Sequence, residues 1–310
     1  MTTRTKNGMG TPALEQIYGK NVARTAKRAR AKLVMTNGEK RAGWGSYLVL
    51  SIALLAFLFP LYYAVSIASQ NSTDTQYGVR SLIPGTGLMK NLALAFEDIN
   101  FWQALGGTTI VTLTVSVSTV FFSTLAGFAF AKLRFKGRNL LLTLVVATMT
   151  IPQQLTVVPM YIMTTKVGLY GSLLAVIIPG LVGAFGVFWM TQYLEDALPY
   201  ELIEAGRVDG ASMGRIFVSI ALPAAKPAAS MLFLFTFIGS WTSYFWPMLI
   251  LGPNKNSMLT VAASALKGAH FTDYTLIMSG VILTAIPLLV VFVFTGRQLV
   301  SGIMAGAVKG

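Results

Sequence analysis

The sequence predicts an all-α polytopic membrane protein with six transmembrane helices. Of its 310 residues, 54% are hydrophobic and only 11% are charged, and the mean hydropathy is +0.65. These values lie outside the range of ordinary soluble domains. The uncharged stretches reach about 20 residues, the length that a helix needs to cross about 30 Å of hydrocarbon. The apolar residues therefore predict membrane spans.

The six spans are taken in chain order. They are predicted at residues 46–69, 104–131, 139–164, 172–193, 224–251 and 276–295. Prolines inside or beside them are expected to kink or interrupt the helices. These prolines are Pro60, Pro152, Pro159, Pro179, Pro247 and Pro287. The spans define an N-terminal extension (1–45), a six-helix membrane domain (46–300) and a C-terminal tail (301–310).

Lysine and arginine are distributed unequally between the two sides of these spans. The N-terminal extension holds ten, the connection after the second span four, the loop 195–226 three and the C-terminal tail two, whereas the opposite side holds five. Cytoplasmic connections carry the excess of positive charge. Both termini and the loop 195–226 are therefore predicted to be cytoplasmic.

The basic N-terminal extension is too long for the first part of a cleavable signal peptide, so the first span is expected to remain as an anchor. Its simplest interpretation is a solvated segment that fixes orientation. A docking arm and a patch for anionic lipids are the alternatives.

Several function classes lack the residues that they require. The chain has no cysteine, a single histidine (His270) and no Gly-x-x-x-x-Gly-Lys-Ser/Thr loop. Apart from Lys226 at the loop end of the fifth, the predicted spans contain no Asp, Glu, Lys, Arg or His, which disfavours an ion-coupled transporter. The net charge of +13 lies between the spans and does not suggest nucleic-acid binding. We expect no catalytic residue, metal or bound cofactor, and energy supplied by another polypeptide.

The loop 195–226 holds five of the eleven acidic residues. Pro199 suits the first turn of a helix, and Asp209-Gly210 is a strong turn signal that should end it. The loop therefore predicts a short surface helix, a turn and a second helix that leads to Pro223, where the chain is expected to bend. Such a knob suits a socket on a partner, although packing on its own bundle is the alternative.

Residues 204–211 read Glu-Ala-Gly-Arg-Val-Asp-Gly-Ala, and Leu222-Pro223 follow. This pattern resembles the conserved cytoplasmic loop of binding-protein-dependent ABC importer permeases, with Gly206 in place of the family's second alanine. Further motifs resemble the carbohydrate-uptake branch, and the closing residues 305–310 resemble the maltose-type second permease subunit. These motifs are Ile151-Pro152, Pro159 with Tyr161, 168–170, Trp241 with Trp246-Pro247, and 305–310.

The resemblance implies a type I ABC importer permease fold in a bacterial or archaeal plasma (inner) membrane. It implies as partners a second, related permease, an ATPase dimer that carries ATP and Mg, an extracytoplasmic solute-binding protein, membrane lipid and a sugar substrate. The expected ATPase-coupling residues are Glu204, Ala205, Gly206, Asp209, Gly210, Ala211, Leu222 and Pro223. The tail residues Val308, Lys309 and Gly310 are expected to reach the ATPase.

Residues 240–246 mix aromatic rings with neutral hydrogen-bonding groups, which suits a sugar. Trp241, Tyr244 and Trp246 are therefore candidates for the solute pathway, with an aromatic belt at the outer interface as the alternative. The resemblance implies that the other permease holds most of the sugar. A permease for polyamines or glycerol phosphate and a stand-alone passive facilitator remain alternative functions.

Overall fold

The computed structural model describes residues 43–73, 82–252, 258–266 and 273–307, with side chains as far as Val293. The N-terminal extension up to residue 42, His270 and the predicted tail contacts Val308, Lys309 and Gly310 lie outside the described residues. The described part is helical and holds no strand. The described residues divide into two compact units, with the boundary after Pro60.

Helix α2 (Trp44–Ala68) matches the first predicted span. The apolar side chains of its first-unit part are largely exposed, as expected of a helix surrounded by lipid or another apolar surface. In the second unit, its last residues Ser66, Ile67 and Ala68 are buried. Pro60 lies inside the helix at the boundary between the units.

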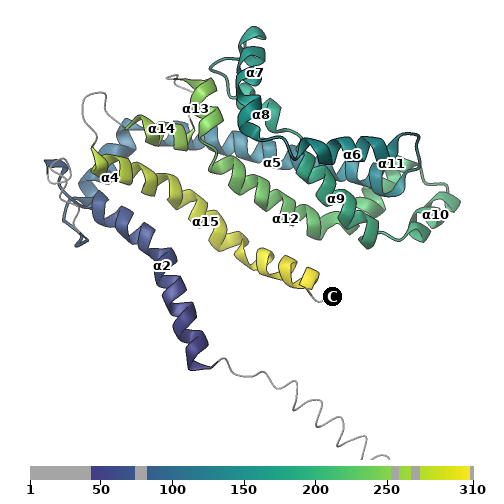
Figure 1. Ribbon diagram of the computed structural model, residues 1–310, viewed down its shortest axis with the longest axis horizontal. Helices are drawn as coiled ribbons and strands as arrows, with labels where there is room; N and C mark the ends of the chain where they lie inside the picture. Colours follow the sequence, from purple (N-terminus) through teal and green to yellow (C-terminus); the bar gives the residue numbers. More distant parts are fainter. Residues whose placement is uncertain (1–42, 74–81, 253–257, 267–272, 308–310) are drawn as a thin grey trace, which may run out of the picture. The chain divides into compact units, whose positions relative to one another are not determined.

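The second unit is built around α5 (Phe101–Lys132), which packs along α9 (Ala184–Ala197) and α12 (Leu222–Trp241) (Figure 1). Two glycines allow α5 and α9 to approach closely. A Cβ atom on Gly127 would lie 2.7 Å from the Cβ of Met190, and one on Gly186 would overlap the Ser123 hydroxyl. Small residues at a helix interface are typical of packing in membranes.

Short helices lie at both ends of α5 (Figure 1). One end carries α4 (Leu88–Asp98) and α14 (Leu259–Ala265), which contact α5 and α15 (Tyr274–Ala307). The opposite end carries α10 (Tyr200–Val208) and α11 (Met213–Ile216).

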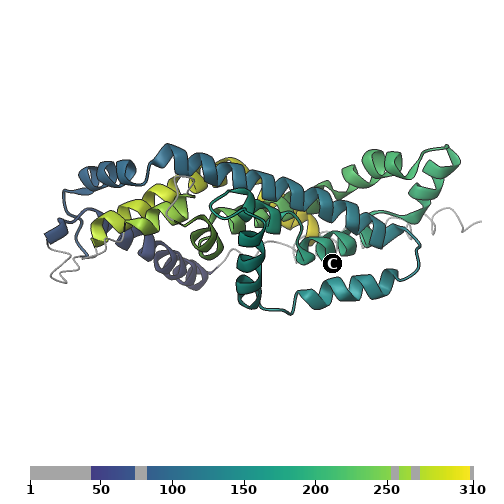
Figure 2. The same cartoon turned by 90° about the horizontal axis from the view of Figure 1, so that it is seen from above.

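The third predicted span is not one straight helix. It is divided into α6 (Arg138–Thr148) and α7 (Gln153–Lys166), which are bent by 96° relative to each other (Figure 2). Pro152 precedes α7 with extended backbone (φ −60°, ψ 129°). The helix is interrupted here because proline lacks an N–H and disfavours a helical conformation in the residue before it. The fourth span is made of α8 (Leu174–Gly180) and α9 together.

The fifth predicted span has different bounds from those expected. The helix begins at Met213 and runs through a π-helical turn, η1 (Phe217–Ala221), into α12, which ends at Trp241; α13 (Phe245–Leu251) is separate. Pro223 was expected to bend the chain, but it lies inside this helical run. The N–H of Leu222 donates to the carbonyl of Phe217, and the wider turn relieves the clash that the proline ring has with a normal helical turn.

Helix α15 extends beyond the sixth predicted span. It begins at Tyr274 and continues to Ala307, so residues 301–307 of the predicted tail continue this helix. Within the described ranges, five helical runs are long and apolar enough to cross a membrane, and the bent pair α6–α7 counts as a sixth when it is taken as one broken span. This agrees with the six predicted spans.

Candidate functional site

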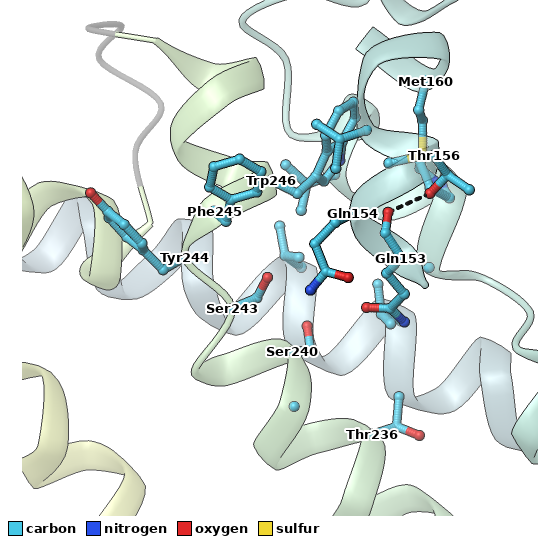
Figure 3. Close-up of a pocket in the computed structure, with 17 residues that line it drawn as sticks. Gln153, Gln154, Thr156, Met160, Thr236, Ser240, Ser243, Tyr244, Phe245 and Trp246 are labelled. Atoms are coloured by element: carbon cyan, nitrogen blue, oxygen red, sulfur yellow. Dashed lines mark hydrogen bonds between the residues drawn. The ribbon is translucent and has the colours of Figure 1, made fainter. Parts of the chain in front are cut away.

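A cavity of about 680 Å³ opens where the start of α7 faces the end of α12 and the α12–α13 connection (Figure 3). Small-molecule sites typically measure about 300–1,000 Å³. No lining residue carries a formal charge at neutral pH. The lining side chains with amides or aliphatic hydroxyls are Gln153, Gln154, Thr156, Thr236, Ser240 and Ser243.

The two backbone breaks described above form this cavity. The break at Pro152 starts α7 with Gln153 and Gln154 at the cavity wall. Because α12 ends at Trp241, Ser243 lies in the connection to α13, and both Ser243 and the start of α13 line the cavity. Both breaks lie inside predicted spans: an interruption was expected at Pro152, but the end of α12 at Trp241 was not.

Not every lining hydroxyl is available to a ligand. Thr156 donates to the carbonyl of Gln153 at 2.8 Å, and Thr236 donates to the carbonyl of Leu232 at 2.8 Å. Such bonds back to the preceding turn are common for threonine in helices.

The three aromatic candidates for the solute pathway have different positions. Trp241 is only 4% exposed, stacks on Phe237 with ring centroids 5.6 Å apart and donates to the carbonyl of Thr284 at 3.4 Å. It belongs to the core between α12 and α15 and does not line the cavity. Tyr244 and Trp246 do line it. The hydroxyl of Tyr244 points away from the two glutamines, however (Figure 3).

The predicted two-helix knob is present at residues 199–216. Helix α10 ends at Val208, and two residues later Gly210 has a φ of +76°, which favours glycine. The N–H of Gly210 donates to the carbonyl of Arg207, and the N–H of Ala211 to that of Gly206, a common helix C-cap. Ser212 then begins α11 by accepting a hydrogen bond from the N–H of Arg215.

The knob has a buried side and an exposed side. Ile203 is 1% exposed and joins the core cluster around Ile216. A Cβ atom on Gly206 would lie 3.3 Å from side-chain atoms of Ile216 and Ile220, so Gly206 faces α11 and η1. The predicted coupling residues that are exposed are Glu204, Ala205, Asp209, Gly210, Leu222 and Pro223, and Ala211 is half-buried.

Two apolar residues of α10 are exposed. Leu202 is 48% exposed and Val208 is 87% exposed. Val208 follows Glu204 by four residues, so an exposed apolar side chain and an exposed carboxylate are neighbours on one face of α10.

Two basic residues hold the base of the knob. The ammonium of Lys132, at the end of α5, donates to the carbonyl of Glu195 in the last turn of α9 at 3.0 Å. The guanidinium of Arg134 lies 5.5 Å from the ring centre of Tyr200, a cation–π contact. In the sequence both residues serve only to predict orientation, and the four basic residues within 132–138 were the available clue to a further role.

Comparison of the sequence with known proteins identifies the family to which it is similar. A family model described as a binding-protein-dependent transport system inner membrane component matches residues 123–303. The arabinooligosaccharides transport system permease protein AraQ of Halalkalibacterium halodurans is 29% identical over 268 residues, with 85% of this chain and 96% of AraQ covered. The lactose transport system permease protein LacG of Rhizobium radiobacter is 31% identical over 268 residues, with 85% and 95% covered.

Two further similarities concern proteins with acidic solutes in their names. The sn-glycerol-3-phosphate transport system permease protein UgpE of Escherichia coli is 28% identical over 267 residues, with 84% of this chain and 95% of UgpE covered. A crystal structure of a bacterial ABC transporter involved in the import of the acidic polysaccharide alginate contains a chain of the same fold. The TM-score is 0.68 at 22% identity, with 84% of this chain and 97% of that chain covered.

The family model covers more than half of the sequence, and the helical order and knob agree with the predicted permease fold. The chain belongs to the family of binding-protein-dependent transport system inner membrane components, the membrane permeases of ABC importers.

Proposed function

We propose that this chain is one of two permease subunits of an ATP-driven importer for neutral sugars (mono-, di- or oligosaccharides). The observation that carries the solute class is the cavity, which combines amides, hydroxyls and aromatic rings without a charged lining residue. Sugars present hydroxyls at their edges and C–H groups on their faces, and such a lining is suited to both. The similarity to AraQ and LacG, which are named as arabinooligosaccharide and lactose permeases, supports a sugar.

The second candidate is a permease for glycerol phosphate, favoured by the similarity to UgpE. A phosphate is normally bound by arginine, lysine or backbone N–H groups, and no arginine or lysine lines the cavity. A polyamine would require carboxylates, and none lines the cavity either. The neutral lining therefore supports the sugar.

We assign ATPase coupling to the loop 195–226. The exposed carboxylate of Glu204 lies on α10 beside apolar surface, and the tight turn at Gly210 fixes the direction in which α10 projects. A helical run joins α11 of the knob to Ser240 at the cavity. A movement of the docked knob would thus be carried by packed helices to the cavity, as alternating access between two states requires.

The partners follow from this assignment. The complete importer would contain a second, related permease, an ATPase dimer that binds ATP and Mg, and an extracytoplasmic solute-binding protein. Both termini and the knob would face the cytoplasm, and Val308, Lys309 and Gly310 would contact the ATPase.

The proposal is tested by purifying the tagged chain gently from its native membrane and identifying the proteins that accompany it. We expect an ATPase and a second permease, and we expect a Glu204→Ala variant to keep the complex but lose solute-stimulated ATP hydrolysis. Recovery of the chain alone, under conditions that preserve complexes, would instead favour a stand-alone facilitator.

A further inference from the structure

The side chains of Gln153 and Gln154 bring two neutral amides to the cavity, and neither amide makes a hydrogen bond within the described part of the chain. Both side chains line the cavity and are exposed at the start of α7. In the part of the chain that the structure describes, neither amide has a hydrogen-bonding partner, whereas most other polar side chains of α7 bond to their own helix. Each amide can both donate and accept hydrogen bonds.

The wall formed by the end of α12 and the turn after it carries two hydroxyls that also lack a hydrogen-bonding partner among the described residues. Ser240 lies near the end of α12 and Ser243 in the turn that follows, and both line the cavity. Figure 3 shows the amide of Gln154 pointing toward the space that these two hydroxyls border. Four hydrogen-bonding groups from three backbone segments thus border one cavity.

Trp246 supplies an apolar wall of fixed orientation. Its indole N–H donates to the carbonyl of Ala175 in α8 at 3.1 Å, so this polar group is already satisfied. The remaining ring surface lines the cavity beside Phe245. An aromatic ring, free amides and free hydroxyls that line one cavity suit a sugar ring, which has apolar C–H faces and a polar rim.

We propose that this cavity is a sugar-binding subsite contributed by this subunit itself. The amides of Gln153 and Gln154 and the hydroxyls of Ser240 and Ser243 hydrogen-bond the hydroxyls of one neutral sugar ring, which lies against Trp246. Gln153 and Gln154 are its specificity-determining residues. This subsite rests on the proposed import of sugars, and it goes further by assigning sugar recognition to this chain and not only to its partner permease.

The test uses the complete importer, purified from its native membrane and reconstituted in proteoliposomes with its solute-binding protein. Uptake of a panel of radiolabelled neutral mono-, di- and oligosaccharides is measured, with glycerol 3-phosphate for comparison, and the best neutral sugar is used for kinetics. Gln153→Leu and Gln154→Leu keep the approximate side-chain length but remove the amide. The matched control is Gln192→Leu, because Gln192 is an exposed glutamine on α9 outside the cavity.

Each cavity variant is expected to raise the KM of uptake by about threefold to tenfold, the effect of losing one hydrogen bond. The maximal rate of solute-stimulated ATP hydrolysis should stay near that of the wild type, and Gln192→Leu should change neither value. A sugar-induced change in tryptophan fluorescence should be present in the wild type and absent in Trp246→Phe.

The outcomes separate this inference from the proposed function. If the wild type imports neutral sugar but neither glutamine variant changes the KM and Trp246→Phe keeps the fluorescence change, the subsite is wrong while the sugar importer stands. If the wild type imports no neutral sugar, both proposals fall. A rise in KM that Gln192→Leu reproduces would also overturn the subsite.

Discussion

The hydroxyl of Thr108 accepts a hydrogen bond from the backbone N–H of Leu259 at 2.8 Å, although the two residues are 151 positions apart. Thr108 is fully buried on α5, and Leu259 is the first residue of α14. No side chain of α14's own N-cap serves this purpose, so Thr108 acts as the cap from another helix. The contact fixes the start of α14 against α5.

Thr108→Val is therefore expected to destabilise the chain by about 1–3 kcal/mol, because it leaves a buried N–H without a partner at nearly unchanged volume. The melting temperature of the purified complex would measure this. Thr109→Val is the control, since Thr109 is adjacent on α5 and only partly buried. Equal melting temperatures for the two variants would contradict the capping role.

Gly127→Ala is expected to disrupt the packing of α5 on α9. The added Cβ atom would lie 2.7 Å from the Cβ and 2.8 Å from the carbonyl carbon of Met190, and backbone cannot move aside cheaply. Overpacking of this kind costs about 1–3 kcal/mol. Gly106→Ala, on the same helix with no atom within 4 Å, is the control. Yield and melting temperature should fall only for Gly127→Ala.

Gly206→Ala should be tolerated, whereas Gly206→Leu should uncouple ATP hydrolysis from solute. A single methyl group would meet the flexible ends of Ile216 and Ile220 at 3.3 Å, and the gain in helix propensity, about 1 kcal/mol, offsets a small adjustment. A leucine is too large for this space and should separate α10 from α11. Solute-stimulated ATPase activity of the assembled complex tests both variants, and wild-type coupling in Gly206→Leu would show that the spacing of the two helices is unimportant.

Asp273 makes the start of α15 sensitive to acid. Partial burial alone would raise the pKa of its carboxyl, but hydrogen bonds from Ser72, Thr275 and the N–H of Leu276 outweigh this effect and lower the pKa below its ordinary value of 3.8. The ionised carboxyl of Asp273 therefore stabilises the folded chain, and this contribution is fully present above pH 3.8 and is lost as the pH falls through the lowered pKa.

Asp273→Ala should accordingly lower the melting temperature at neutral pH, with a difference from the wild type that shrinks below pH 3.8. Thermal unfolding of both proteins across this range provides the measurement. A difference that stays constant down to pH 2 would exclude the carboxylate as its source.

Hydropathy predicted the spans well for a physical reason. A helix can cross lipid only if its stretch of uncharged, apolar residues is long enough, and both the length and the composition of such a stretch can be read directly from the sequence. The breaks were harder to predict. Proline at position 152 was expected to kink or interrupt its helix, but a 96° change of direction depends on what α6 and α7 pack against. Gln153 and Gln154 were not predicted as site residues, because two uncharged amides within an apolar stretch form no distinctive pattern.

Trp241 and Trp246 illustrate a second limit. On one continuous helix, residues five apart point about 140° away from each other, so the two indoles could not both face one pathway. The sequence did not reveal which one faced inward, because the apolar stretch hides the end of α12 at Trp241. The turn at Asp209-Gly210 was predictable because glycine's left-handed backbone is a local property of the residue itself.

The length of the helical run from Met213 to Trp241 determines how far one end moves when the run tilts. Its 29 residues extend over roughly 43 Å at about 1.5 Å per residue. If one end were held, a tilt of about 5° would displace the other by roughly 4 Å, which is more than the shifts of about 1–2 Å common between packed helices and less than one helical turn of about 5.4 Å. The run is thus a lever long enough to amplify a small rotation of the knob into a change in the width of the cavity beside Ser240.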